Sequence, residues 1–211
     1  MTKTVVWDFD GVLNDNMRAG RFLWADDFDA RVGAPLASFV AFVFGDNWDR
    51  ILTGQEDIRS RLQSWFEAEG LTHRPEDFLS DWLQRDTFPE PMLGAYVDDL
   101  SRRGVPQVIA TNNEPQRAAF IADQMGWSAR VDGIFASGTL GLRKPDSAFF
   151  HKVAEDLGTA PTALILVDDT QDNIRAARAA GWSALPCTPA TRATIPTAVE
   201  AWLGGAPVGP P

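Results

Sequence analysis

Apolar runs and helix-spaced apolar positions alternate along most of this chain. Two nearly continuous runs, Val5-Val6-Trp7 and Leu164-Ile165-Leu166-Val167, are each followed by aspartate, and shorter runs cover 107–110 and 134–136. Continuous runs of this length are typical of strands that are buried on both faces of a parallel sheet. In the intervening segments apolar residues recur every three or four positions, which indicates amphipathic helices. The pattern predicts an α/β fold in which a parallel sheet carries helices on both faces.

The residues that follow the first strand have a different pattern. From 15 to 87 the apolar residues keep helical spacing, no strand is expected, and breaks fall at glycine and proline, as in Gly33-Ala34-Pro35. We expect this segment to be a helical-bundle cap inserted into a Rossmann-like core formed by residues 1–14 and 88–203. The end of the chain, 204–211, is rich in glycine and proline and is expected to be a disordered tail.

Composition and charge narrow the classes of function. The chain of 211 residues is 45% apolar and 23% charged, as expected for a globular protein with a hydrophobic core. Its net charge of −10 argues against binding to the backbone of nucleic acid. One cysteine, Cys187, fits a reducing cytoplasm, and no segment has the pattern of a signal peptide or a membrane span. We therefore expect a cytoplasmic protein whose partner is a small molecule rather than nucleic acid or membrane.

Acidic residues follow the two strongest predicted strands. Asp8 and Asp10 come after the first strand, and Asp168 and Asp169 come after the run at 164–167. A single aspartate in such a place is usually a turn residue or a helix cap. Ligands of open α/β sheets, however, bind beyond the carboxyl ends of the strands, where these two pairs would meet. Four crowded carboxylates repel one another, so we expect them to hold a divalent cation, preferably magnesium.

Groups that suit phosphoryl transfer are expected at the same edge. Thr111 and Asn112 follow the strand at 107–110, and Lys144 lies on a loop between later elements. A carboxylate can attack a phosphoryl group only if the negative charge of that group is screened. Magnesium and Lys144 would supply the screening, and Thr111 would orient the phosphate oxygens. The sequence therefore predicts a phosphoryl-transfer site.

Four motifs carry a resemblance to a known family: Asp8-Phe9-Asp10-Gly11-Val12-Leu13, Thr111-Asn112, Lys144-Pro145-Asp146 and Asp168-Asp169-Thr170-Gln171-Asp172-Asn173. In this order they resemble those of the haloacid dehalogenase superfamily of phosphohydrolases. The position of the helical insertion is similar to that of the subfamily with a small helical cap. The stretch from Gly141 to Gly181 is similar to bacterial sugar-phosphate phosphatases of the α-D-glucose-1-phosphatase type.

The resemblance implies catalytic and metal-binding roles for the aspartates. Asp8 would attack phosphorus and form an aspartyl-phosphate. Asp10 would protonate the leaving alcohol and then deprotonate the water that hydrolyses the intermediate. Asp8, the backbone carbonyl of Asp10, and Asp169 would bind Mg²⁺ directly, and Asp168 would do so directly or through water. The role of Asn173 stays open between a hydrogen-bonding residue at a helix start and a neighbour of the metal.

The resemblance also implies a set of substrate-binding residues. Thr111 would bind a phosphate oxygen, and Lys144 would pair with both Asp8 and the phosphate. Gly11 and Asn112 belong to the same phosphate-binding motifs. The implied reaction is magnesium-dependent hydrolysis of a small phosphorylated metabolite, with sugar phosphates as one expected class.

Three other activities use similar residues. A phosphomutase would keep every core residue and differ in the cap, so it stays as the alternative. A dehalogenase of this fold is disfavoured because such enzymes lack the second aspartate that Asp10 supplies. A response-regulator receiver, which is a phosphoacceptor binding module, is disfavoured because no strand-end aspartate lies between Asp10 and Asp168.

The cap is expected to move. Aspartyl-phosphate chemistry needs water to be excluded during attack and admitted afterwards. We expect the cap to pivot near Asn14-Asp15 and Pro89-Glu90-Pro91. Closure would bring cap side chains such as Arg18 or Arg21 toward the leaving group.

Overall fold

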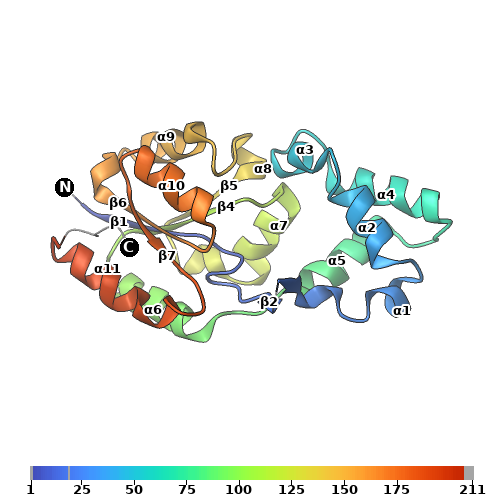
Figure 1. Cartoon of the computed structure of the whole chain (residues 1–211), viewed down its shortest axis with the longest axis horizontal. Coiled ribbons are helices and arrows are strands. Elements are labelled where there is room, and N and C mark those ends of the chain that lie inside the picture. The colour runs from blue at the N-terminus through green and yellow to red at the C-terminus, as the bar shows by residue number, and fades with distance from the viewer. Residues whose placement is uncertain (1, 19, 207–211) are drawn as a thin grey trace.

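The computed structural model describes residues 2–18 and 20–206, which form a larger core and a smaller cap placed end to end (Figure 1). The core contains a five-stranded, fully parallel sheet in the order β5-β4-β1-β6-β7. Its strands are β1 Thr4–Trp7, β4 Gln107–Thr111, β5 Gly133–Ala136, β6 Leu164–Asp168 and β7 Ser183–Pro186. The predicted α/β fold is confirmed, although β7 was not anticipated.

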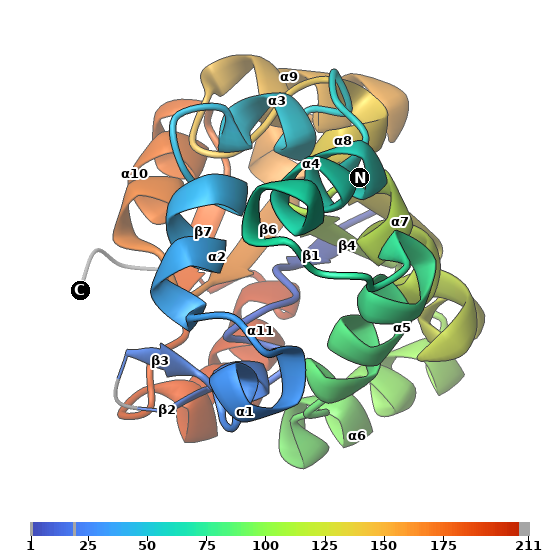
Figure 2. The ribbon, with the colours of Figure 1, turned by 90° about the vertical axis from the view of Figure 1, so that its right-hand side faces the viewer.

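Helices cover both faces of the sheet (Figures 1 and 2). On one face α6 and α11 pack against Val5 and Trp7, and on the other α9 and α10 pack against Val6. Successive residues of β1 thus point to opposite faces and are all buried, which explains why the run is apolar throughout. The core helices are α6 Pro91–Arg102, α7 Pro115–Ala119, α8 Ser137–Leu140, α9 Ser147–Asp156, α10 Gln171–Ala179 and α11 Ile195–Leu203. A π-helical segment, Phe120–Gln124, and 3₁₀ turns at Trp127–Ala129, Pro161–Ala163 and Arg192–Thr194 complete the core.

The cap is an aromatic-rich helical bundle. Its helices are α1 Phe28–Val32, α2 Leu36–Val43, α3 Trp48–Leu52, α4 Ile58–Glu69 and α5 Pro75–Arg85, with a 3₁₀ turn at Leu23–Ala25. Phe28, Phe39, Trp65 and Phe78 pack together in its interior. The expectation that this segment has no strand was wrong, because β2 Met17–Arg18 and β3 Arg21–Phe22 form a small antiparallel hairpin. Strands of two residues are too short to leave a periodic pattern in the sequence.

Two connectors that pair with each other join the cap to the core. Asn14 and Pro89 form an antiparallel bridge, the Asp15 amide donates to the Phe88 carbonyl (2.7 Å), and the Glu90 amide donates to the Leu13 carbonyl (2.9 Å). The side-chain oxygen of Asn14 also accepts from the Phe88 amide (2.7 Å). The insertion therefore leaves and re-enters the core at one point. Its limits at 15–87, and a pivot at this point, remain predictions.

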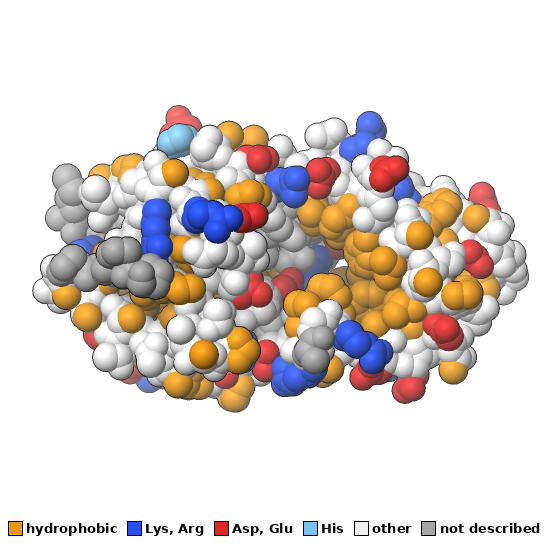
Figure 3. Space-filling view, in the orientation of Figure 1, with side chains coloured by type: hydrophobic (Ala, Val, Ile, Leu, Met, Phe, Trp, Pro, Cys, Tyr) orange, Lys and Arg blue, Asp and Glu red, His pale blue; other side chains and the backbone are white. Residues whose placement is uncertain are grey.

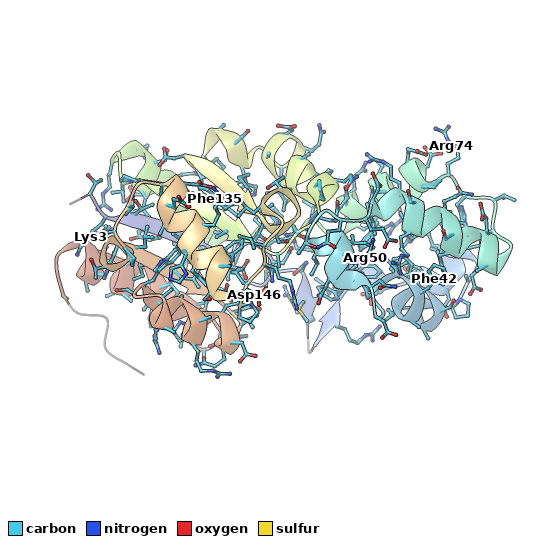
Figure 4. All side chains as sticks on the ribbon, turned by 90° about the horizontal axis from the view of Figure 1, so that it is seen from above. Lys3, Phe42, Arg50, Arg74, Phe135 and Asp146 are labelled. Atoms are coloured by element: carbon cyan, nitrogen blue, oxygen red, sulfur yellow. The ribbon has the colours of Figure 1, made fainter. Side chains whose placement is uncertain are left out.

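The cap contacts the core a second time, away from the connectors. Arg143 pairs with Asp49 of α3 (3.0 Å), and the amide of Gln116 donates to Asp57 (3.0 Å). Figure 4 shows this boundary from above, with Arg50 on its cap side and Asp146 on its core side. Arg143 comes directly before Lys144 in the chain, so this contact ties the cap to the loop that carries Lys144. The two parts are thus held together at both ends of the space between them.

Two expectations concern membranes and the end of the chain. No helix within residues 2–18 and 20–206 is long and apolar enough to cross a membrane. Of the expected tail, residues 207–211 lie outside the described residues. Residues 204–206 follow the end of α11.

Gly54 provides a test of the second contact. Gly54 has a φ of +69°, and a Cβ there would lie 2.2 Å from the Gly138 carbonyl of the core, whereas Gly70 has a φ of +67° and open space around it. Alanine at either position should cost about 1–2 kcal/mol of backbone strain. Only Gly54→Ala should also push the cap from the core, so it should raise amide hydrogen exchange in α3 and α8. Equal exchange in Gly54→Ala and the Gly70→Ala control would rule out this contact.

Candidate active site

Three carboxylates meet at the carboxyl edge of the sheet. β1 pairs with β6 so that Trp7 lies opposite Val167, and the Asp8 amide donates to the Val167 carbonyl (2.8 Å). This register brings Asp8 beside Asp168, the last residue of β6. Oxygens of Asp8, Asp168 and Asp169 all lie within 4.8 Å of one another. The structure therefore brings together three of the four predicted metal ligands through their side chains.

Lys144 is buried against two of these carboxylates. Its Nζ lies 2.9 Å from Oδ1 of Asp8 and 2.7 Å from Oδ2 of Asp168, and the residue is only 1% exposed. Burial alone would lower the pKa of Lys144, but the charges of Asp168 and Asp8 outweigh it and raise the pKa. Burial raises the pKa of Asp8 well above its usual range, Asp168 raises it further, and Lys144 opposes both. Three carboxylates against one ammonium group leave an excess of negative charge at this cluster.

Neighbouring residues fix the geometry of the cluster. The side chain of Asn173 donates to both oxygens of Asp168 (3.0 and 3.1 Å). The side chain of Asn112 accepts from the Lys144 amide (2.8 Å) and donates to the Lys144 carbonyl (2.7 Å). Gly11 has a φ of +81°, and a Cβ there would lie 2.2 Å from Oδ2 of Asp169. Asn112 therefore holds the Lys144 loop, and Gly11 leaves room for the third carboxylate.

The carboxylate of Asp10 lies in a different environment from the other three. Its Oδ1 accepts from the side chains of Asn14 (2.8 Å) and Asn16 (3.0 Å) and pairs with Arg117 (3.2 Å). Its Oδ2 accepts from Asn113 (2.9 Å). The side chain of Asp10 thus lies apart from the group of Asp8, Asp168 and Asp169. The four partners hold it in one orientation.

Thr111 is linked to Asp10 through Asn113. Thr111 ends β4 and is buried, and its hydroxyl accepts from the Asn113 side chain (2.7 Å). The same Asn113 amide group donates to Asp10. Asn113 directly follows the motif Thr111-Asn112, and this adjacency was the signal that could have identified it. The role of Thr111 in binding phosphate remains a prediction.

Arg117 of α7 was missed in the sequence. It is only 4% exposed and pairs with both Asp10 and the Asp86 carboxylate (3.1 Å), while it also donates to the Asp86 carbonyl (2.9 Å). Burial raises the pKa of Asp86 to about 7, with Arg117 opposing the rise and Asp10 adding to it. Arginine on a helix is normally exposed, so the sequence carried no signal for this residue. Asp86 lies at the end of the cap, so Arg117 connects the cap to Asp10.

A cavity of about 570 Å³ opens between the core and the cap, and its lining includes Asp10, Asn112 and Asn113 from the core side. Figure 3 shows hydrophobic side chains gathered around the hollow between the two parts. Arg21 also lines the cavity, whereas the exposed Arg18 pairs with Asp15 (2.9 Å). Of the two arginines expected near a leaving group, the structure brings only Arg21 to this space.

Known proteins share the sequence and the fold. A family model described as haloacid dehalogenase-like hydrolase matches residues 2–181. The sesquiterpene phosphatase astK of Aspergillus oryzae is 26% identical over 190 residues, 88% of this chain and 90% of its own. A phosphoglycolate phosphatase of Xylella fastidiosa is 34% identical over 188 residues, 85% of this chain and 77% of its own.

A solved structure shares the same architecture. An enzyme of the same family from Bacteroides thetaiotaomicron, in complex with magnesium and inorganic phosphate, superposes with a TM-score of 0.72 at 16% identity, covering 88% of this chain and 94% of its own. The family model spans most of the chain, and the bacterial phosphatase is similar over most of both lengths. This chain belongs to the haloacid dehalogenase-like hydrolase family.

Proposed function

We propose that this protein is a magnesium-dependent phosphomonoesterase that acts through a phosphorylated aspartate. The observation that carries the proposal is the cluster of Asp8, Asp168 and Asp169 around the buried Lys144. Phosphoryl transfer needs a nucleophile and positive charge at one point, and this cluster offers both. The phosphatases among the relatives support the same reaction class.

The donor set at the cluster fits Mg²⁺. Asp8, Asp168 and Asp169 offer only oxygen ligands, which a hard divalent cation prefers, and Lys144 does not balance their charge alone. The backbone carbonyl of Asp10, which the sequence predicted as a further ligand, belongs to the loop after β1 that also carries Asp8. When bound, the ion would neutralise charge on the phosphoryl oxygens. The magnesium and phosphate bound by the Bacteroides enzyme agree with this assignment.

The residues of the site would act in two steps. In the first, a carboxylate oxygen of Asp8 bonds to phosphorus, the bond from phosphorus to the ester oxygen breaks, and Asp10 gives its proton to that oxygen. In the second, Asp10 takes a proton from water, the water oxygen bonds to phosphorus, and Asp8 is released with inorganic phosphate. Lys144 and Thr111 would hold the phosphoryl oxygens in both steps.

Asp10 favours hydrolysis of an ester over dehalogenation. Departure of an alcohol needs a proton, whereas departure of a halide does not. The four partners of Asp10 fix the orientation of its carboxylate, and Asp10 lines the cavity in which the leaving group would lie. A phosphomutase would use the same residues and stays as the alternative. Analysis of the products distinguishes the two, because a phosphatase releases inorganic phosphate and a mutase does not.

The prediction that sugar phosphates are one class of substrate rests on the resemblance of residues 141–181 to sugar-phosphate phosphatases. None of these residues lines the cavity beside Asp10. The resemblance therefore supports the phosphoryl-transfer chemistry of the core and leaves the choice of leaving group to the cap. The two relatives, a phosphoglycolate phosphatase and a sesquiterpene phosphatase, also differ from each other in the leaving group of the substrate in their names.

Removal of the metal tests the proposal first. Exhaustive treatment with EDTA should abolish hydrolysis of an aryl phosphate, and added Mg²⁺ should restore it. Asp169→Asn should raise the Mg²⁺ concentration needed for half-maximal activity, because it removes one charged ligand. Asp172→Asn, at an exposed aspartate on α10, is the matched control and should leave that concentration unchanged. Turnover that survives EDTA would refute the metal requirement.

The two aspartates of the first motif should respond differently to substitution. Asp8→Asn should abolish turnover of every phosphate ester, because it removes the nucleophile. Asp10→Asn should lower kcat by about 10²–10⁴-fold on an alkyl phosphate, the usual contribution of proton transfer, and by less on an aryl phosphate with a good leaving group. Equal losses on both esters would show that Asp10 does not protonate the leaving group.

Arg117 should act through Asp10. Arg117→Lys keeps a charge but loses the fork that joins Asp10 and Asp86, so kcat on an alkyl phosphate should fall on the order of 10²-fold. The loss on an aryl phosphate should be smaller. Arg102→Lys, at an exposed arginine, is the control and should change neither rate. A loss of equal size on both esters would assign Arg117 to the stability of the fold instead.

A further inference from the structure

The cavity beside Asp10 has an apolar and aromatic wall. Among the cap residues that line it are Trp24, Leu36, Val40, Phe44, Trp48 and Trp82. The rings contact one another, with centroids 4.6 Å apart for Phe44 and Trp48 and 5.3 Å apart for Trp24 and Trp82. Such ring contacts fix the positions of the aromatic side chains in the wall. The cap already contacts the core through the pair of Arg143 and Asp49, and the cavity is still present. Closure of the cap on the core does not fill this space.

The apolar wall includes unusually exposed side chains. Phe22 is 41% exposed and Val40 is 44% exposed, and both line the cavity. Within residues 2–18 and 20–206 one other large hydrophobic residue is exposed, Met92, and it lies outside the cavity. Apolar surface left in water is unfavourable by about 25 cal/mol per Å². A concave patch of this kind, next to reactive groups, is typical of a site that a ligand covers.

Apart from Arg21, the polar residues that line the cavity are Asp10 and residues joined to it, directly or through Asn16, or to Lys144 by hydrogen bonds, and they have partners within the protein. Asn16 donates to Asp10 and Asp86, Asp86 pairs with Arg117, and Asn112 is bonded to the Lys144 backbone. A buried hydroxyl without a partner is unfavourable. The one cationic residue of the lining, Arg21, pairs with Asp26 (3.5 Å), and apolar residues outnumber polar ones in the lining. The wall therefore offers few groups for the several hydroxyls of a sugar.

The size of the cavity limits the length of the ligand. A methylene group is close in size to a water molecule, whose share of liquid volume is about 30 Å³. A cavity of about 570 Å³ is much larger than a two-carbon acid requires. It would accept a hydrocarbon group of roughly ten to fifteen carbons with space left around it.

We infer that the substrate is the phosphate monoester of an apolar alcohol, with a hydrocarbon group of this size lying between the aromatic side chains of the cap. The inference rests on the proposed function, since it places the ester oxygen at Asp10 and the phosphoryl group at Asp8. The aromatic wall then binds the part of the substrate that departs as the alcohol. Because an alkoxide is a poor leaving group, such a substrate also depends on the proton of Asp10.

A series of alkyl phosphates tests the inference. Purified protein with Mg²⁺ is assayed on butyl, hexyl, octyl and decyl phosphate below the concentrations at which micelles form, and on glycerol 3-phosphate and glucose 6-phosphate. The value of kcat/KM should rise by roughly two- to four-fold per methylene and then level off as the cavity fills. Both polyol phosphates should lie at least ten-fold below decyl phosphate. A flat series, or a preference for a polyol phosphate, would overturn the inference.

A charged residue in the wall provides the matched comparison. Val40→Asp changes an exposed side chain, so the fold should persist, and it should lower kcat/KM for decyl phosphate by roughly ten-fold more than for glycerol 3-phosphate. Met92→Asp changes another exposed apolar side chain, 37% exposed and outside the cavity, and should leave both values unchanged. Equal losses on the two esters in Val40→Asp would contradict a role for this wall in binding the alcohol.

Binding separates this inference from the proposed reaction. Decylphosphonate cannot be hydrolysed, and its binding should change the fluorescence of the tryptophans in the wall, with weaker affinity in Val40→Asp and unchanged affinity in Met92→Asp. If decylphosphonate binds in this way but no phosphate ester is hydrolysed, the proposed function fails and the ligand class stands. If aryl phosphate is hydrolysed in an Asp8-dependent manner but decylphosphonate does not bind, the ligand class fails and the proposed function stands.

Discussion

Mutual repulsion among Asp8, Asp168 and Asp169 is the constraint on which the rest of this site depends. Parallel pairing of β1 and β6 brings the first two side by side, and the left-handed backbone at Gly11 leaves space for the third. Lys144 neutralises part of their charge, and because Asp8 and Asp168 are buried, the remaining negative charge strongly favours a bound cation. The same arrangement that makes these carboxylates unfavourable neighbours therefore makes them suitable for binding Mg²⁺ and a phosphoryl group.

Asp10 connects the chemistry of the core with the cap. Two of its partners, Asn14 and Asn16, lie where the chain passes from the core into the cap, and Asn113 and Arg117 come from the core. Arg117 in turn reaches the end of the cap through its contacts with Asp86. A movement of the cap about its paired connectors would therefore change the surroundings of the proposed proton donor. Selection of the leaving group by the cap and its protonation by Asp10 are linked by these contacts.

The sequence predicted the features that depend on local pattern. Buried strands leave continuous apolar runs, so β1 and β6 and the acidic residues after them could be identified. β7 could not, because Ser183–Pro186 contains no β-branched residue and ends in proline. Arg117 could not, because its burial depends on Asp86, 31 positions away. The aromatic wall depends on how the helices of the cap pack against one another, and the spacing of aromatic residues along one helix does not contain that information.

Every step of the proposed reaction depends on phosphorylation of Asp8. The most direct measurement is to incubate the Asp10→Asn protein with Mg²⁺ and an aryl phosphate, quench it in acid, reduce it with borohydride and locate the modified residue by mass spectrometry. Asn at position 10 should slow hydrolysis of the intermediate, so the phosphoryl group should accumulate, and reduction should convert residue 8 to homoserine. Hydrolysis of the ester with residue 8 unmodified, or modification of another residue, would contradict the account.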